Sequence, residues 1–281
     1  MTHILIADGG STKTDWALVR TGEGVVQRIT TDGINALLAS REDVHRVLEE
    51  TRRRLNYLPS EIYYYGAGCA TEQINSKMAE ALESAFDGAK AFVYSDLLGA
   101  ARGLFADKSG IVCILGTGSN SCLFSKGKIE HNVPSLGYIL GDEGSGAALG
   151  KRLINEVFKG QLPELVKEKF LEWSGLTLPD ILHKVYRCPA PNKFLASLVG
   201  FISQNIWNPY IYSLVLEEFS RFITRNVALY PGAHTLPIGC VGSISVGFEK
   251  ILREAASNQG YNISHITRSP MEGLIYYHAQ I

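Results

Sequence analysis

Residues 8–16 read DGGSTKTDW, and residues 115–124 read LGTGSNSCLF. Each stretch follows an apolar run with the composition of a β-strand and leads into a second such run, which places both at turns between strands. Glycine lacks a Cβ, and serine and threonine carry hydroxyl groups, so the backbone N–H groups of such a turn can approach an anion closely. A single copy is explained equally well by the positive φ angles of a tight hairpin turn. Two copies in equivalent positions predict a pair of phosphate-binding loops.

We name residues 9–13 the first loop and residues 116–118 the second loop. Neither is one of the commoner nucleotide-binding signatures, because the chain has no GxxxxGK[ST] and neither glycine run opens a helix. The sequence therefore predicts that phosphates are held by hairpin turns.

The composition of the chain excludes several classes of protein. Its 281 residues are 46% hydrophobic, which is enough for two compact domains. A formal net charge of −1 offers no basic surface for nucleic acid, and no run approaches the ~20 apolar residues of a membrane span. The five cysteines form no CxxC pair, and Cys113 and Cys240 lie in apolar runs, so we expect core thiols and a reducing cytoplasm. The seven histidines lack zinc-site spacing.

The order of strand and helix patterns predicts an α/β protein. In the first hundred residues we expect strands from His3, Asp15 and Val25, at 62–65 and at 91–94, and helices from Ser40, Thr71 and Asp96. A polar stretch at 106–110 marks the main boundary. Beyond it we expect strands at 111–115, 121–124 and 128–132, a helical block at 145–230, a strand at 236–241, a helix from Val246, a strand at 263–267 and a last helix after Pro270.

Five motifs together give the chain a family resemblance. They are DGGSTKT at 8–14, SDLLGA at 95–100, LGTGSN at 115–120, LGYILGDEGSG at 136–146 and PIGCVGSI at 237–244. With these motifs the chain resembles the BadF/BadG/BcrA/BcrD ATPase-like family of the sugar kinase, heat-shock protein 70 and actin superfamily, and within it the N-acetylglucosamine kinases. The resemblance implies two ribonuclease-H-like (actin-type ATPase) domains flanking a cleft. One would span 1–107 plus about 271–281, and the other 108–270 with the helical block as an insertion.

For the phosphates, the resemblance implies that both loops clasp the β- and γ-phosphates of ATP. The residues concerned are Gly9, Gly10, Ser11, Thr12 and Lys13 in the first loop, and Gly116, Thr117 and Gly118 in the second. Asp8 would lie near Mg²⁺, through water, which suits a hard cation that keeps several water ligands. Two alternatives stay open: Asp8 as a turn-forming residue at a strand end, and Lys13 as a solvated side chain.

The resemblance makes Asp96 the general base, which would accept the proton of a sugar hydroxyl as that hydroxyl attacks the γ-phosphorus. From the residues alone, Ser95-Asp96 before an apolar helix is typical of an N-cap. Both roles are compatible, because a cap position holds a carboxylate at a defined place.

Sugar and nucleotide residues are also carried over from the family. The residues implied for the sugar are Asn35, Gly66, Ala67, Gly68, Asn120, Asp142 and Glu143, and those for the adenosine side are Gly242 and Ser243. Structural alternatives exist for most of them. Asn35 could bond its own turn, Asp142 or Glu143 could cap a helix from Ser145, and Gly242 could end a buried strand.

The function implied is that of an ATP-dependent amino-sugar kinase, with N-acetylglucosamine 6-phosphate as product and ATP and Mg²⁺ as cofactors. The expected partners are an amino sugar and ATP, with no nucleic acid or membrane; a homodimer stays open. One alternative is another amino sugar, N-acetylmuramic acid or glucosamine. A second is an iron–sulfur ATPase that activates 2-hydroxyacyl-CoA dehydratases, although that branch carries a cluster cysteine where this chain has Asp96. A third is a non-catalytic sensor of sugar or nucleotide.

Overall fold

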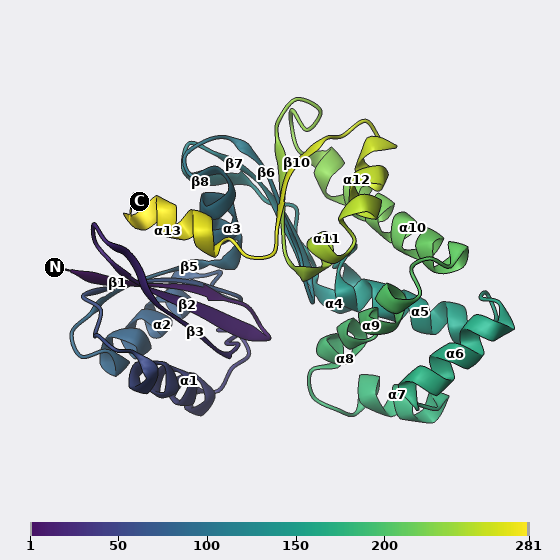
Figure 1. Ribbon diagram of the computed structural model, residues 1–281, viewed down its shortest axis with the longest axis horizontal. Helices are drawn as coiled ribbons and strands as arrows, with labels where there is room; N and C mark the ends of the chain where they lie inside the picture. The colour runs from purple at the N-terminus through teal and green to yellow at the C-terminus, as the bar shows by residue number, and fades with distance from the viewer. Residues whose placement is uncertain (1, 280–281) are drawn as a thin grey trace. The chain divides into compact units, whose positions relative to one another are not determined.

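The computed structural model describes residues 2–279, which form two five-stranded β-sheets with helices packed on them (Figure 1). The first sheet has the strand order β3-β2-β1-β4-β5. Its strands are β1 (His3–Gly9), β2 (Lys13–Arg20), β3 (Gly24–Asp32), β4 (Glu61–Gly66) and β5 (Lys90–Ser95). Because β1, β4 and β5 are parallel, their carboxyl ends meet at one edge, with Gly9 opposite Gly66 and Gly66 opposite Ser95. Ligands of α/β proteins bind at such an edge.

Helices cover both faces of the first sheet. They are α1 (Arg41–Arg54), α2 (Glu72–Ala85), α3 (Asp96–Phe105) and α13 (Met271–Ala279). The helices α1 and α2 begin after the predicted caps Ser40 and Thr71, and their buried side chains share a core with Leu5 of β1. The buried side chains of α13 share a second core with Ile4 and Ile6 on the opposite face of the sheet, where α13 lies against α3 (Figure 1).

The second sheet has the strand order β10-β9-β6-β7-β8. Its strands are β6 (Gly110–Leu115), β7 (Ser119–Ser125), β8 (Lys128–His131), β9 (Ile238–Val241) and β10 (Ile263–Thr267). The helices between β8 and β10 are α4 (Gly137–Leu140), α5 (Gly146–Phe158), α6 (Glu164–Ser174), α7 (Leu178–Tyr186), α8 (Pro191–Ser197), α9 (Val199–Gln204), α10 (Pro209–Arg225), the 3₁₀-helix η1 (Val227–Leu229), α11 (Ser243–Gly247) and α12 (Glu249–Ser257). The helical block predicted for 145–230 is therefore present.

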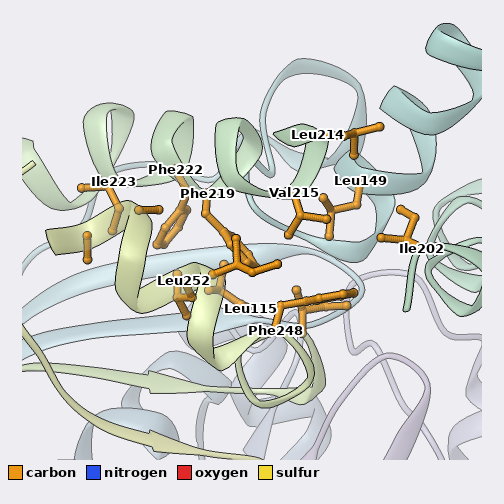
Figure 2. Packing of buried hydrophobic residues seen from close by; sticks show 14 of the residues in the cluster. Leu115, Leu149, Ile202, Leu214, Val215, Phe219, Phe222, Ile223, Phe248 and Leu252 are labelled. Carbon is orange, nitrogen blue, oxygen red and sulfur yellow. The ribbon is translucent and has the colours of Figure 1, made fainter. Parts of the chain in front are cut away.

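Helices and the second sheet enclose one large apolar core. Figure 2 shows Phe219 and Phe222 of α10 packed with Leu252 of α12 and Leu115 of β6. The thiols of Cys113 and Cys240 are buried register partners in β6 and β9, which confirms them as core residues. This core holds the segment after β6, which carries the second loop.

The chain forms two compact units. One comprises Met1–Ser109, Phe124–Ile129 and Ser269–Ile281, and the other Gly110–Leu123 and Glu130–Arg268. We expected 1–107 plus about 271–281 for the first domain, which does not include the β7–β8 hairpin at 124–129. The two last residues of that expectation, 280 and 281, lie outside the described part of the chain.

Some predicted elements start a few residues from the expected position. The helix expected from Val246 begins at Ser243, because β9 ends at Val241 and the chain turns into α11 at Gly242, and the strand expected at 236–241 begins at Ile238. Within residues 2–279, no helix has both the length and the apolar composition needed to cross a membrane.

Candidate active site

The first loop is a tight turn between β1 and β2. The Gly10 amide donates to the Lys13 carbonyl at 2.9 Å. A Cβ on Gly9 would lie 2.7 Å from the Tyr64 hydroxyl, so glycine is required there for space. No glycine of either loop has a positive φ angle, and the alternative that these glycines serve left-handed turn geometry is wrong.

A second segment of chain supports the first loop from the side. The Gly33 amide donates to the Thr12 carbonyl at 3.1 Å, and a Cβ on Gly33 would meet the Gly10 carbonyl at 2.4 Å. Two residues on, the side-chain nitrogen Nδ2 of Asn35 donates to the Ser11 hydroxyl at 3.2 Å. Asn35 also accepts from the Leu37 amide at 3.1 Å, so it bonds its own turn, as the structural alternative required, and holds the loop as well.

The predicted turn at 66–68 belongs to the same cluster. The Ala67 amide donates to the Gly9 carbonyl at 2.7 Å, and the Ala67 carbonyl accepts from the Ala36 amide at 2.9 Å. Gly68 has a φ of +80°, and a Cβ there would lie 2.4 Å from the Asn35 side-chain oxygen. The structure thus brings together the first loop, Asn35 and the turn at the carboxyl edge of the first sheet.

Two carboxylates lie at this edge. Asp8 precedes the first loop, and its carboxylate accepts a hydrogen bond from the Ser269 hydroxyl at 2.7 Å. Burial raises the pKa of Asp8, and the charge of Asp15 raises it further, whereas the Ser269 hydrogen bond and Lys13 lower it. Lys13 itself is exposed and forms an ion pair with Asp15.

Asp96 is the first residue of α3, and the helix cap is its neighbour. Ser95 accepts from the Leu98 amide at 3.2 Å, whereas Asp96 accepts from the Leu97 amide at 2.8 Å. The N-cap alternative therefore applies to Ser95 and leaves the Asp96 carboxylate with one short local bond. Burial raises the pKa of Asp96 to about 6, the Leu97 amide lowers it and the charge of Asp8 raises it. The two carboxylates are thus close enough to interact.

The second loop lies at the start of α5. The Gly116 amide donates to the Gly118 carbonyl at 2.9 Å, closing the turn. From α5, the Gly146 amide donates to the Gly116 carbonyl at 2.8 Å and the Ala147 amide to the Thr117 carbonyl at 3.0 Å. A Cβ on Gly116 would meet no atom within 4 Å. The first amides of α5 are thus used to hold the second loop, and the space beside Gly116 is open.

Asp142 packs directly against the second loop. A Cβ on Gly118 would lie 2.9 Å from an Asp142 carboxylate oxygen, and this carboxylate accepts from the Ser119 amide. Burial raises the pKa of Asp142 to about 6, the Ser119 amide and Lys151 lower it, and Glu143 raises it. The cap of α5 is Ser145, which accepts from the Ala148 amide at 3.1 Å, so neither Asp142 nor Glu143 is a cap.

Helix α10 fixes the turn that carries Asp142. Buried Glu143 pairs with Arg225 at 2.5 Å, and the Gly144 amide donates to buried Glu218 at 3.2 Å. Glu218 and Arg225 were not predicted. A signal was present for Glu218, because it stands four residues from both Leu214 and Phe222, in the buried face of α10.

Asn120 and the adenosine-side residues have structural partners of their own. The side-chain oxygen of Asn120 accepts from the Ser121 backbone amide at 2.9 Å and from the side-chain nitrogen of Asn132 at 3.0 Å. A Cβ on Gly242 would lie 2.1 Å from the Leu115 carbonyl, at a φ of +129°, so close packing at the strand end accounts for this glycine. Ser243 is exposed at the start of α11.

Each unit therefore assembles part of the predicted site. Asp8, the first loop, Asn35, the turn at 66–68 and Asp96 meet in one unit, and the second loop, Asn120, Asp142 and Glu143 lie near one another in the other. Sequence reasoning missed Gly33, Ser269 and Glu218, which act through contacts with residues distant in the chain.

Comparison with known proteins identifies relatives of the whole chain. The model of the BadF/BadG/BcrA/BcrD ATPase family matches residues 7–196. A solved structure of a candidate N-acetylglucosamine kinase from Porphyromonas gingivalis is 43% identical, with a TM-score of 0.90 and 99% of both chains covered. A second, from Chromobacterium violaceum, is 20% identical with a TM-score of 0.75, again over 99% of both chains, and supports the fold alone.

A curated relative has a described activity. The N-acetylmuramic acid/N-acetylglucosamine kinase of Clostridium acetobutylicum is 26% identical over 249 residues, which are 81% of this chain and 78% of that protein. Together with the likeness to solved structures, these matches confirm the predicted family and the α/β class of the sugar-kinase and actin-type ATPase fold.

Proposed function

The chain belongs to the BadF/BadG/BcrA/BcrD ATPase family, and on that premise we propose that it is an ATP-dependent amino-sugar kinase that phosphorylates the 6-hydroxyl of N-acetylglucosamine. One observation supports this most strongly. Asp96 stands beside Asp8 and the first loop at the carboxyl edge of the first sheet, with a pKa of about 6. A carboxylate with that pKa is largely ionised at neutral pH and is a stronger base than an ordinary aspartate.

The reaction is a transfer of the γ-phosphoryl group. Asp96 takes the proton of the sugar hydroxyl as its oxygen bonds to the γ-phosphorus, and the bond from that phosphorus to the bridging oxygen of ADP breaks. The N–H groups of the two loops, other than the Gly10 and Gly116 amides that close the turns, stabilise charge on the phosphates. Open space at Gly116 and the lack of side chains at Gly9 and Gly10 support this role.

Mg²⁺ fits the donor set at Asp8. The charge of Asp8 raises the pKa of Asp96, so two carboxyl groups lie near each other, and carboxylate oxygens are the ligands that Mg²⁺ prefers. Among residues 2–279, no three His, Cys, Asp or Glu side chains are grouped to hold a metal ion. Mg²⁺ commonly binds through one or two carboxylates, water and substrate phosphates. When bound with ATP, it neutralises charge on the phosphate oxygens.

For the sugar, we propose Asn35, the turn at 66–68, Asn120 and Asp142 as the binding residues. Asn35 is held between Ser11 and its own turn, and Asp142 is held by the Ser119 amide, so both polar groups are preorganised. The Glu143 carboxylate is engaged by Arg225, and its role is to support Asp142.

A coupled assay of ADP release tests this proposal. The sugars compared are N-acetylglucosamine, N-acetylmannosamine, N-acetylmuramic acid, glucosamine and glucose, and phosphorus NMR of the product locates the new ester. We expect kcat/KM for N-acetylglucosamine to exceed that for glucose at least tenfold, because buried polar groups left unpaired by a sugar without the acetamide are costly. A higher kcat/KM for N-acetylmuramic acid would change the substrate, and ADP release independent of every sugar would overturn the kinase proposal.

A further inference from the structure

Ser269 makes a contact that no sequence motif indicates. Its hydroxyl donates to the Asp8 carboxylate at 2.7 Å, across 261 positions of the chain. Ser269 lies between β10 and α13, at the residue where the chain rejoins the unit that contains Asp8. The same hydroxyl oxygen accepts from the Met271 amide at 3.2 Å, so Ser269 also bonds the first amide of α13.

The two hydrogen bonds orient each other. A serine hydroxyl has one hydrogen to donate and two lone pairs to accept with. Because the Met271 amide occupies a lone pair, the O–H bond is directed toward Asp8. A hydrogen bond to an ionised acceptor is stronger than one between neutral groups. The Asp8 carboxylate is thus held in one orientation.

Packing fixes the position of Ser269. The buried side chains Met271, Leu274 and Ile275 of α13 share a core with Ile4 and Ile6 of β1, the strand that contains Asp8. Ser269 lies two residues before α13, and Asp8 lies in β1, so the packing of this helix on this strand brings donor and acceptor together.

Asp8 needs such a partner, because its surroundings oppose its charge. Its side chain is half-buried, and the like charge of the Asp15 carboxylate acts on it. Lys13, the nearby cation, is exposed and paired with Asp15. A partly desolvated carboxylate without a fixed donor would be free to rotate toward other partners.

We propose that Ser269 is a positioning residue of the kinase site, which holds the Asp8 carboxylate ready for the Mg²⁺ that accompanies the nucleotide. This inference rests on the proposed function. Residues that orient a metal-binding carboxylate typically change metal affinity by about 10- to 100-fold when they are replaced. Through Met271 the same hydroxyl joins the site to the helix that completes this unit.

Ser269→Ala and Ser269→Thr test the proposal, with Ser40→Ala as the matched control. Ser40 makes the same two kinds of bond, donating to the Asp43 carboxylate at 2.7 Å and accepting from the Asp43 amide at 3.1 Å, but it caps α1 and contacts no site residue. The measurement is the melting temperature at constant ADP as Mg²⁺ is increased, which needs no turnover.

We expect Ser269→Ala to raise the Mg²⁺ concentration for half-maximal stabilisation at least tenfold. Ser269→Thr, which retains the hydroxyl, and Ser40→Ala should leave that concentration within about threefold of the wild type. Both alanine variants should lose a similar amount of stability without ligand, since each loses one hydrogen bond to a backbone amide in the first turn of a helix. If either alanine variant fails to fold, Ser269→Thr against the wild type is still informative, and a tenfold loss of Mg²⁺ response in it contradicts the proposal.

If Ser269→Ala left the Mg²⁺ concentration for half-maximal stabilisation unchanged, Ser269 would serve only the start of α13, and the inference would be overturned. A wild type whose melting temperature does not depend on Mg²⁺ would remove the metal role of Asp8, and this proposal with it. Failure of the wild type to phosphorylate any sugar, with a normal Mg²⁺ response, would overturn only the proposed function.

Discussion

At the scale of single residues, burial decides the chemistry of Asp96. The side chain stands at the first position of α3, and desolvation is the largest cause of its raised pKa. A residue that only shaped the helix end would gain from being ionised near the helix N-terminus. The ionised form of Asp96 is instead destabilised by burial and by a second carboxylate nearby, and such a raised pKa is typical of functional sites.

Asp96→Asn should lower kcat by about 10² to 10⁴, the usual scale for loss of a general base. In the wild type, kcat/KM should fall as the pH drops below about 6, because protonation removes the base. Rates of both proteins from pH 5 to 8 give the measurement. The asparagine variant should show no acid limb.

The stability of the same variant provides the control. The folded-state pKa of Asp96 lies above its ordinary value of 3.8, so ionisation destabilises the fold above pH 6, and this cost disappears as the pH falls through 6 toward 4. Asp96→Asn should therefore be more stable than the wild type at pH 7, by on the order of 2 kcal/mol, and not at pH 4. A destabilised variant that retained a third of wild-type kcat would show a purely structural role.

At the scale of elements, the second loop is built on other elements and has little structure of its own. Its carbonyls accept from the first amides of α5, and Asp142 from the preceding turn fills the space beside Gly118. Glu218 of α10 in turn holds the amide after Glu143. A three-residue loop with such supports can present its N–H groups without rearrangement, which is the condition for electrostatic stabilisation of a phosphoryl group.

Gly116→Ala and Gly118→Ala distinguish a glycine that leaves room for a ligand from one that leaves room for a neighbouring side chain of the protein. The methyl group added by Gly116→Ala would meet no protein atom. The melting temperature should therefore stay unchanged, while the affinity for ATP falls at least tenfold. The methyl group added by Gly118→Ala would lie 2.9 Å from the Asp142 carboxylate, so both the melting temperature and the affinity for ATP should fall. Calorimetric titration with ATP and thermal melts provide the data. Wild-type ATP affinity in Gly116→Ala would exclude this glycine from the phosphate site.

At the scale of the whole molecule, the unit that holds Asp8 and Asp96 is completed by the far end of the chain. From Ser269 the chain rejoins that unit, after the helices between β8 and β10, which belong to the other unit. The contact between α13 and α3 is unusually close, since a Cβ on Gly273 would lie 1.8 Å from the Gly103 carbonyl (Figure 1). Only two facing glycines allow this approach.

Gly273→Ala should lower the free energy of unfolding by about 1–3 kcal/mol, the scale of overpacking at a tight contact, because α13 must move away from α3. Glu272→Ala, its neighbour, removes an exposed ion pair with Arg28 and should change stability by less than about 1 kcal/mol. Urea denaturation of both variants compares them. Equal stabilities would show that α13 contributes little to this unit.

The sequence by itself determined the elements and the candidate loops. Apolar periodicity placed strands such as 263–267, and cap residues such as Ser40 and Thr71 placed helix starts, because these signals act within a few residues. The two glycine-hydroxyl stretches located both loops for the same reason. Asp8 and Asp96 lie in two of the five motifs, Asn35 was implied by the family resemblance, and the roles of all three stay proposals.

Only the tertiary structure decided which residues support those loops. Gly33 lies against the Gly10 carbonyl, Glu218 binds the Gly144 amide and Ser269 binds Asp8, and each pair is separated by many residues. The structure also replaced the explanation of the loop glycines: none of them has left-handed geometry, and Gly9 and Gly118 are needed for space. Local sequence signals cannot report such contacts, because the partner is brought near only when sheets and helices pack. The raised pKa of Asp96 has the same origin, since burial is a property of the folded chain.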